Sequence, residues 1–268
     1  MFIMHEKLTY AINGCLFEVF RKLGNIWNED VYESAAELEL RSLGMKTERQ
    51  KEFDVFYFDK NVGTYRTDML VEDTVIVELK AVPDISPLHK AQLIAYLKGM
   101  NKPLGILVNF GGFKAECQTF PNILHLRTPL RDDFDFDKIR LEGKESIKEL
   151  LLMANRILTT LGAGYFHQIY RRAFYYELKE AGIDFKIHKA ISAQYKNKTI
   201  GSKEVNFFII GDMLLSVIAV KEMDGLILNK LCNYGHYLRR KRGLIFNFNA
   251  LHLDFRYFSD IDNYRKAG

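Results

Sequence analysis

The amino-acid sequence predicts an α/β protein with two tandem copies of one domain, each a mixed β-sheet flanked by helices. The first observation is a repeat, because residues 23–110 align with residues 161–248 at a constant offset of 138 and without a gap. A long fixed period indicates a duplicated unit. The second observation is the order within each copy: two helical patterns, three strand-like runs, one helix and one strand. That order is typical of a mixed sheet with helices packed on it.

Identical residues at this offset define the repeat. They include Leu23-Gly24 with Leu161-Gly162, Tyr32 with Tyr170, Gly44 with Gly182, Gly63 with Gly201, Tyr96 with Tyr234, and Asn109 with Asn247. Residues identical in both copies are expected to serve the fold. Chemical groups found only in the first copy are candidates for function.

Three helices are expected in the first copy. Apolar residues from Leu8 to Leu23 recur at helical spacing, and Gly24 ends that helix because glycine readily adopts the left-handed conformation of a helix end. The second helix spans residues 29–43, and the third spans residues 88–100.

Four strands are expected, at residues 53–58, 65–71, 75–80 and 104–109. A turn over residues 59–63 joins the first two, and a three-residue turn over residues 72–74 joins the next two. The second copy repeats this order. Its first helix is expected to begin with a capping box, in which Ser146 and Glu149 bond to backbone N–H groups.

These elements divide the chain into a first domain at residues 1–128, a polar linker at 129–145 and a second domain at 146–268. The formal charge of +4 and the pI near 8.7 permit a polyanionic partner without demanding one. Three scattered cysteines favour free thiols over disulfides or a zinc cluster. The sequence shows neither a signal peptide nor a membrane span, so we expect a soluble cytoplasmic protein.

One hairpin of the first copy gathers groups that can carry chemistry. With residues 72–74 as the turn, Asp68 falls opposite Glu78, and opposed residues of an antiparallel pair share a face. Lys80 is two residues beyond Glu78 and lies on the same face, whereas Val77 points into a core. Two carboxylates and an ammonium are therefore expected on one patch of sheet.

Two hard oxygen donors at this spacing suit Mg²⁺, which polarises a phosphoryl oxygen and lowers the pKa of a bound water. Lys80 would then orient or activate the attacking water. The alternative is an ordinary exposed hairpin face with weak salt bridges. Glu29 could add an acidic ligand, and Gln92 and Tyr96 share one face of the following helix.

These residues resemble a known set of motifs. Asp68, Glu78-x-Lys80 and Gln92-x-x-x-Tyr96 resemble the PD-(D/E)XK nuclease superfamily, including the Q-x-x-x-Y element of its RecB-like branches. The segments around Leu23-Gly24, Glu29 to Tyr32, Val77 to Lys80 and Gly105 to Phe110 resemble the GxxExxY family within it. The resemblance covers about residues 8–125. It implies a restriction-endonuclease-like core, Mg²⁺ (or Mn²⁺) dependence and hydrolysis of phosphodiesters in DNA or RNA.

The second copy departs from these motifs at almost every chemical position. By offset, Glu29 becomes His167, Asp68 becomes Asn206, Glu78 becomes Ser216, Lys80 becomes Ile218 and Gln92 becomes Lys230, whereas Tyr96 is kept as Tyr234. Asn and Ser supply no negative charge for a divalent cation, so the second copy is expected to be non-catalytic. Because the second copy keeps this tyrosine although it lacks the other motif residues, a packing role for Tyr96 is an alternative to a catalytic one.

Arg239, Arg240, Lys241 and Arg242 form the sharpest basic cluster, and with Lys230 they are candidates for binding nucleic acid. The alternative is a solvated helix end, where cations are favoured by the helix dipole.

Three functions follow. The first is a Mg²⁺-dependent nuclease in which Asp68, Glu78 and Glu29 bind metal and Lys80, Gln92 and Tyr96 complete the site. The second is a non-catalytic nucleic-acid-binding or assembly protein, with the two domains packed as an intrachain pseudo-dimer. The third is a hydrolase of another phosphodiester.

Overall fold

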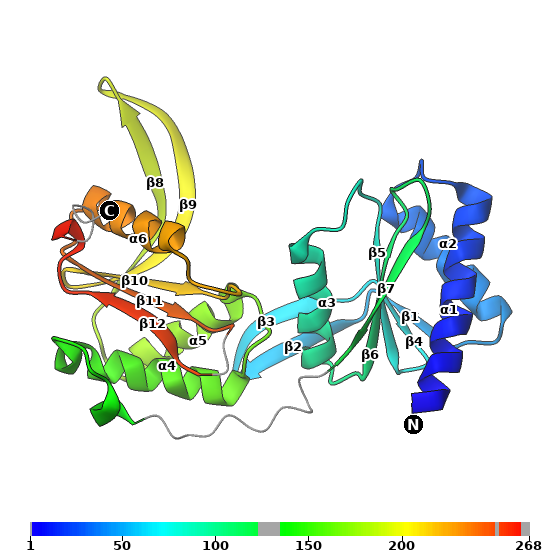
Figure 1. Ribbon diagram of the computed structural model, residues 1–268, viewed down its shortest axis with the longest axis horizontal. Coiled ribbons are helices and arrows are strands. Elements are labelled where there is room, and N and C mark those ends of the chain that lie inside the picture. Colours follow the sequence, from blue (N-terminus) through cyan, green and yellow to red (C-terminus); the bar gives the residue numbers. More distant parts are fainter. Residues whose placement is uncertain (1, 123–134, 250–251, 264–268) are drawn as a thin grey trace. The chain divides into compact units, whose positions relative to one another are not determined.

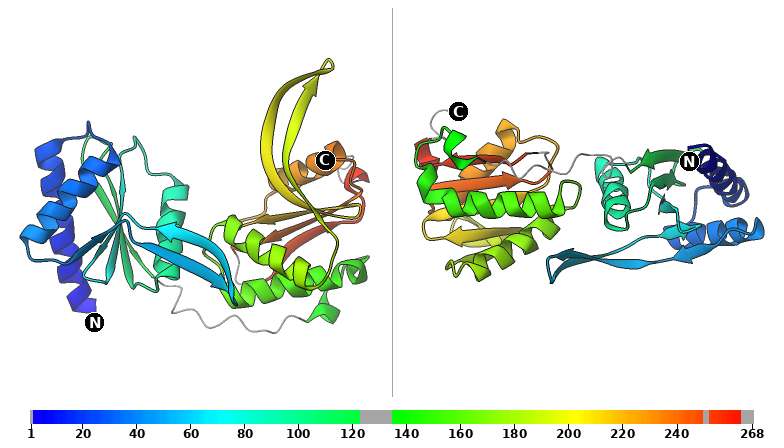
Figure 2. Two further views of the ribbon diagram at one scale, coloured as in Figure 1. Left: turned by 180° about the vertical axis from the view of Figure 1, so that it is seen from behind. Right: turned by 90° about the horizontal axis from the view of Figure 1, so that it is seen from below.

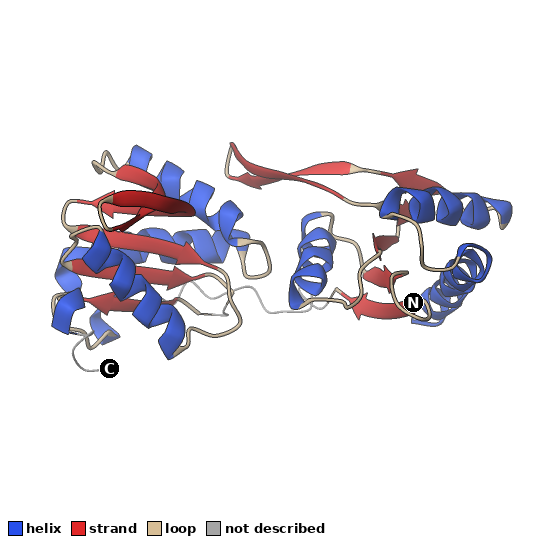
Figure 3. Ribbon diagram, turned by 90° about the horizontal axis from the view of Figure 1, so that it is seen from above, coloured by secondary structure: helices blue, strands red, loops and turns tan. Residues whose placement is uncertain are grey.

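A computed structural model describes residues 2–122, 135–249 and 252–263. The chain divides into two compact units, of which the first comprises Met1–Thr128 with Gly164–Phe166 and the second comprises Pro129–Ala163 with His167–Gly268. Each unit contains a five-stranded mixed sheet covered by helices on both faces, so the predicted α/β fold is confirmed (Figures 1 and 3).

The sheet of the first unit has the order β1-β4-β5-β6-β7. Its strands are β1 (Thr47–Arg49), β4 (Met69–Val71), β5 (Val75–Lys80), β6 (Leu104–Asn109) and β7 (Glu116–Pro121). Only β5 and β6 run parallel; the other neighbours are antiparallel. The central strand β5 is buried along its whole length.

Two helices cover one face of this sheet and a third covers the other (Figure 1). α1 (Phe2–Leu23) and α2 (Glu29–Ser42) pack on the face that carries Val75, Val77 and Leu79. α3 (Pro87–Gly99) packs on the face that carries Ile76. The odd-numbered residues of β5 therefore point into a core, as predicted, and its even-numbered residues lie under α3.

Two predictions about the strands before β4 were wrong. β2 (Glu52–Tyr57) and β3 (Lys60–Arg66) form a separate two-stranded sheet whose turn lies at Phe58 and Asp59, not over residues 59–63. Gly63 lies in β3 opposite Val55, beside a register shift, where a strand tolerates glycine well. A single strand over residues 65–71 was also wrong, because the chain bends at Thr67 and Asp68 before β4 begins.

The sheet of the second unit has the order β12-β11-β10-β9-β8, with only β10 and β11 parallel among neighbours. Its elements are η2 (Phe136–Lys138), η3 (Lys144–Ile147), α4 (Lys148–Leu161), α5 (His167–Glu180), β8 (Lys186–Tyr195), β9 (Lys198–Ile210), β10 (Met213–Ile218), α6 (Gly225–Tyr237), β11 (Arg242–Asn247) and β12 (Asp254–Phe258). Four of these have the bounds of α2, β5, α3 and β6 shifted by 138 residues. The duplication is thus visible element by element.

The capping box predicted at Ser146 is wrong. A short 3-10 helix, η3, precedes α4, so the N-cap position falls on Ile147, which makes no side-chain cap bond. Ser146 Oγ instead donates to the carbonyl of Gly143, 2.7 Å away. Ser146 lies inside the 3-10 turn, and its hydroxyl bonds within that turn instead of capping α4.

The tyrosines and asparagines shared by both copies have structural roles, as predicted. Tyr32 Oη donates to the carbonyl of Gly24 at 2.8 Å, and Tyr170 Oη donates to that of Gly162 at 2.7 Å. Each ring also stacks on a phenylalanine of its own unit, with centroids 4.4 and 4.7 Å apart. These bonds hold the end of the preceding helix against the start of the next one.

The two copies differ most in structure at β8 and β9. In the first unit, β1 and β2 are separate and β3 ends before β4, whereas β8 and β9 run without interruption as strands of 10 and 13 residues. β10 pairs with β9 only at Phe208–Ile210, so the remaining length is a two-stranded ribbon that extends away from the sheet (Figures 1 and 2). No helix among the described residues is long and apolar enough to cross a membrane.

Candidate active site

The predicted chemical groups meet where β5 leaves the core of the first unit. The three-residue turn at residues 72–74 pairs Val71 with Val75 and Met69 with Val77, as predicted. The ladder ends there, and Asp68 lies one residue beyond it, with its Oδ2 accepting a hydrogen bond of 2.8 Å from the N–H of Leu79. That bond fixes the carboxylate of Asp68 beside the end of β5.

Lys80 lies among three carboxylates. Its Nζ is 2.8 Å from Glu78 Oε1, 3.7 Å from Glu29 Oε2 and 3.8 Å from Asp68 Oδ2. Nζ also donates to the carbonyl of Leu79 at 2.8 Å. The predicted clustering of Asp68, Glu78 and Lys80, with Glu29 within reach, is therefore confirmed as geometry.

Glu29 supplies the most open side of this cluster. It is the first residue of α2, placed there because Asn28 caps the helix by accepting from the N–H of Val31. Glu29 Oε1 accepts from the N–H of Ala81 at 3.2 Å. Its side chain is 44% exposed, whereas that of Glu78 is fully buried, so Glu29 lies on the solvent-exposed side of the cluster.

Gln92 and Tyr96 cover the buried side. Gln92 Nε2 donates to Glu78 Oε1 and to Tyr96 Oη, both at 2.7 Å. Ser86 begins α3 with a capping box, and the i, i+4 spacing on that helix puts both side chains over Glu78. Tyr96 packs against Phe53 with ring centroids 5.9 Å apart, and Gln92 bonds to both Tyr96 and Glu78.

Glu33 is a site neighbour that the sequence analysis missed. It lies one helical turn after Glu29 on α2, is 3% exposed, and pairs with Arg49 of β1 at 2.7 Å. It also accepts from Gln50, whose backbone N–H donates to the carbonyl of Asp68 at 3.0 Å. The signal was the i, i+4 spacing from Glu29, which puts both acids on one helix face.

Burial shifts the pKa values of the site. It raises the pKa of Glu78 to about 8, with the charge of Asp68 adding to the effect and Lys80 opposing it. Burial likewise raises the pKa of Asp68, against the opposing effects of Lys80 and the Leu79 N–H. Burial alone would lower the pKa of Lys80, but the neighbouring carboxylates, Glu78 first, outweigh it and raise that pKa. Lys80 therefore stays charged.

One oxygen of the site lacks a partner. Glu78 Oε2 is buried and has no hydrogen bond within the described part of the chain. A buried polar atom left unpaired is costly, so Glu78 Oε2 is a position where an ion or a water molecule would be favoured. Within residues 2–122, 135–249 and 252–263, however, no group of three acidic, His or Cys side chains is arranged to hold a metal ion. The carboxylates are not arranged as metal ligands because they converge on the ammonium of Lys80.

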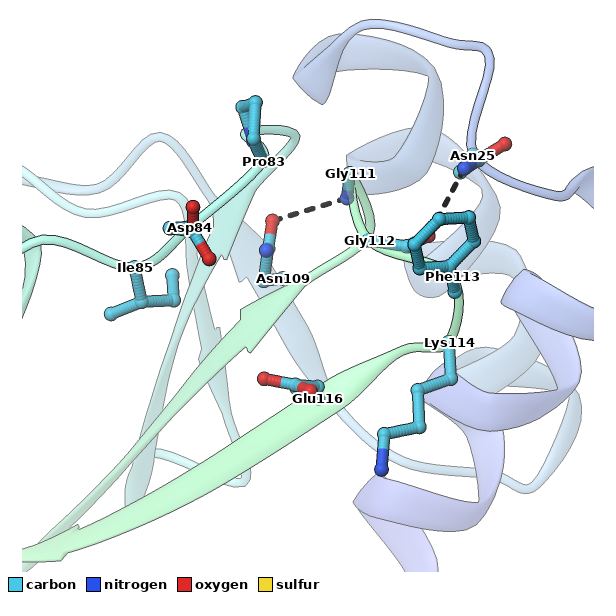
Figure 4. A pocket seen from close by; sticks show the side chains of 10 residues that line it. All are labelled: Asn25, Pro83, Asp84, Ile85, Asn109, Gly111, Gly112, Phe113, Lys114 and Glu116. Atoms are coloured by element: carbon cyan, nitrogen blue, oxygen red, sulfur yellow. Dashed lines mark hydrogen bonds between the residues drawn. The ribbon is translucent and has the colours of Figure 1, made fainter.

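A cavity of about 710 Å³ opens at the carboxyl ends of β5 and β6, and its lining includes none of the three carboxylates or Lys80 (Figure 4). Asn109 lines it and pairs directly with Lys80 in the β5–β6 register. Its amide bonds to both the N–H and the carbonyl of Val82 and accepts from the N–H of Gly111, so it ties together the loops after β5 and β6. Phe113 stands fully exposed at the rim.

The equivalent positions of the second unit form no such cluster. Ser216 is buried in β10, and Ile218 packs against the core under α6. Asn206 adopts a left-handed backbone conformation with φ 68° and donates to Glu204 Oε1 at 2.8 Å. Tyr234 packs on Phe207 with centroids 5.1 Å apart, and Lys230 is exposed.

Two residues of the basic cluster after α6 make bonds that stabilise the fold. Arg242 pairs with Asp212 at 2.5 Å, and Arg240 donates to the carbonyl of Gly211 at 3.2 Å. Arg239 and Lys241 remain exposed. Two of the four cations therefore anchor the turn between β9 and β10.

The comparisons with known proteins agree with this geometry. The family description "PD-(D/E)XK nuclease superfamily" matches residues 6–120 and again residues 144–258, two segments that differ by the same 138 residues. Nothing matches among curated proteins or among solved structures. Because the two matches together span most of the chain, this protein belongs to the PD-(D/E)XK nuclease superfamily and contains two tandem copies of its fold.

Proposed function

We propose that the first unit is a metal-dependent nuclease that hydrolyses phosphodiester bonds in DNA or RNA, and that the second unit is non-catalytic. One observation carries the proposal: three carboxylates converge on a buried lysine, and one carboxylate oxygen, Glu78 Oε2, has no hydrogen-bond partner among the described residues. An ordinary exposed hairpin face would have neither the burial nor the orphaned oxygen. The membership of the superfamily supports the reaction class.

Asp68, Glu78 and Glu29 would hold Mg²⁺ or Mn²⁺, since hard oxygen donors suit these ions. When bound, the ion would polarise the phosphoryl group and lower the pKa of a water. The chain's own contribution is the buried setting, which keeps Asp68 fixed on the Leu79 N–H and Glu78 fixed on Gln92.

Lys80 would orient the attacking water and offset the negative charge that develops on the phosphate, since its ammonium is charged and lies among the ligands. Gln92 would position Glu78. Tyr96 acts through Gln92 and is proposed as a positioning residue, in line with the persistence of tyrosine at Tyr234.

We further propose that the chain belongs to the GxxExxY group of the superfamily, on the segment from Gly24 through Glu29 to Tyr32. The catalytic domain would span residues 1–128, with residues 129–145 as linker and residues 146–268 as the degenerate copy. The substitutions Asn206, Ser216 and Ile218 support the loss of chemistry in that copy.

The test is a cleavage assay with Mg²⁺ or Mn²⁺ on single- and double-stranded DNA and RNA. Asp68→Asn and Glu78→Gln should abolish cleavage, because each removes a charge that the cation needs. Ser216→Ala, at the position equivalent to Glu78, is the matched control and should leave cleavage unchanged. Cleavage by the Asp68→Asn protein equal to that of the unmodified chain would contradict the proposal.

The second candidate is a non-catalytic nucleic-acid-binding or assembly protein whose two units pack as a pseudo-dimer. It is favoured by the position of Lys80, whose ammonium lies within 4 Å of all three carboxylates and competes with a cation for them. Titration with Mn²⁺ separates the two candidates, because a binding module has no need of a cation at Asp68 and Glu78.

A further inference from the structure

The β8–β9 ribbon of the second unit has no role in the core. From the pair Ala190–Glu204 to the turn at its tip, the ribbon has two strands and no third strand beside it. Nearly every side chain along this length is exposed. A segment that buries so little apolar surface contributes little to stability, so its retention as a long regular ribbon requires another explanation.

The ribbon carries a large positive charge. Residues 186–204 contain a single acidic residue, Glu204, and five lysines: Lys186, Lys189, Lys196, Lys198 and Lys203. Their formal charge of +4 equals that of the whole chain, so the rest of the sequence is balanced. The excess positive charge of the protein is thus concentrated on the β8–β9 hairpin, with Lys196, Lys198 and Lys203 on its free length and Lys186 and Lys189 at its base.

The first unit provides an internal comparison. Its equivalent stretch, residues 48–66, contains four basic and four acidic residues and is neutral. The two stretches align without a gap, so the fold itself does not require the lysines. The positive charge is present only on the ribbon of the copy that lacks the candidate catalytic groups.

The shape of the ribbon is fixed at both ends. Lys196 and Asn197 adopt left-handed conformations with φ 47° and 61°, as a two-residue type I′ hairpin turn requires. Near the base, Tyr237 of α6 donates to the carbonyl of Ser192, and Lys203 Nζ lies 5.6 Å from the ring centre of Tyr234. An arm held in one conformation loses little entropy when it binds.

We propose that the β8–β9 ribbon is a binding arm for duplex DNA. The major groove of B-DNA is about 12 Å wide and admits a two-stranded ribbon. The six residues Ala190–Tyr195 extend the arm by about 20 Å at the usual rise of a strand, which is long enough to cross that groove with lysines beside both phosphate backbones. The deep and narrow major groove of an RNA helix excludes such an element.

This inference deepens the proposed nuclease function, on which it rests only for the choice of nucleic acid as partner. It assigns the main contact to the ribbon and leaves Arg239 to Arg242 a minor one, since Arg242 and Arg240 are bonded to the turn after β9. The substrate of the full chain would then be double-stranded DNA.

The experiment measures binding of a fluorescein-labelled 24-base-pair DNA duplex by the full chain in EDTA, by fluorescence anisotropy at several salt concentrations. The triple variant Lys189→Gln, Lys196→Gln, Lys198→Gln should bind at least tenfold more weakly. Its salt slope should fall by roughly 2–3, because each lost phosphate contact removes about 0.9 from the slope. The control Arg239→Gln, Lys241→Gln removes two exposed cations and should change binding less than threefold.

Unchanged affinity and slope in the triple variant, with an unchanged thermal unfolding temperature, would overturn the inference. So would binding of an RNA duplex that is as tight as that of DNA and falls equally in the triple variant. Because no cleavage is needed, the two proposals fail separately. DNA binding without any Mn²⁺-dependent cleavage contradicts the proposed function alone, and cleavage with no effect of the ribbon lysines contradicts this inference alone.

Discussion

At the scale of single residues, the site was predictable where local spacing determines it. A three-residue turn sets the register of β4 and β5, so the proximity of Asp68, Glu78 and Lys80 follows from counting. Glu33 was not predictable in the same way, because its position beside Asp68 depends on the packing of α2 against β1, a strand of three polar residues with no apolar pattern.

The raised pKa of Glu78 predicts a pH-dependent stability in the absence of metal. The folded protein keeps a proton on Glu78 up to a pH of about 8, whereas the unfolded chain releases it near the ordinary value of 4.5. The folded state therefore binds more protons across this window, and its stability falls as the pH rises. The unfolding temperature measured in EDTA should drop between pH 5 and pH 8.5.

Glu78→Gln is the control for this effect, because it keeps the shape of the side chain and removes the titration. Its unfolding temperature should change less over the same pH range, and Mn²⁺ at pH 8.5 should stabilise only the unmodified protein. An equal pH dependence in both proteins would show that other groups cause it.

Lys80→Met should separate metal binding from chemistry. Removing the ammonium from among three carboxylates removes a competitor for a divalent cation, so Mn²⁺ should bind at least as tightly as in the unmodified chain. Cleavage should be lost, because no charged group then orients the water. Calorimetry with Mn²⁺ and the cleavage assay measure the two quantities, and weaker Mn²⁺ binding would contradict the prediction.

At the scale of elements, the helices and the central strands were predicted within a few residues, because most helices have an apolar period or a glycine at the end and the central strands are short continuous apolar runs. The missed strands β1, β7 and β12 lie away from the centre of their sheets and mix polar with apolar residues, so no period marks them. The long uninterrupted strands β8 and β9 were not predicted. The two copies align without a gap, so nothing in the sequence indicated that the separate strands of the first unit are continuous in the second.

The asparagines at the ends of β6 and β11 should be equally important for folding and unequal in function. Asn109 bonds to Val82 and Gly111, and Asn247 bonds to Val220 and Asn249. Either substitution by alanine leaves part-buried backbone groups unpaired and should lower the free energy of unfolding by roughly 1–3 kcal/mol.

Only Asn109→Ala should weaken Mn²⁺ binding, because only Asn109 holds the loop that follows Lys80. Urea denaturation and Mn²⁺ calorimetry on both variants measure the two effects. A loss of Mn²⁺ affinity in the Asn247→Ala protein would show that the second unit contributes to the metal site.

At the scale of the whole molecule, the duplication was the most predictable feature, because a gapless offset of 138 residues is visible in the letters and recurs in the family matches. The charge on the ribbon was not predictable from the sequence, since its five lysines are spread over 19 residues and come together only when β8 pairs with β9.

The full chain should bind one Mn²⁺ ion and not two. Asn206 and Ser216 replace the carboxylates of Asp68 and Glu78, and Ile218 replaces the lysine. Calorimetric titration of the full chain should give a stoichiometry of about one, and Asp68→Asn should abolish the binding. A stoichiometry of two, or a residual site in Asp68→Asn, would show that the second copy holds metal.

The ribbon also leaves β8 as the edge strand of its sheet, with a row of backbone N–H and carbonyl groups open to strands of other molecules. Such edges promote aggregation, which proteins resist with lysines and irregular pairing. β8 has both, in Lys186 and Lys189 and in two register shifts along its pairing with β9. High salt screens the mutual repulsion of these lysines, so light scattering should show more self-association at 1 M than at 0.1 M salt. The same lysines that would attract a polyanion would also oppose self-association.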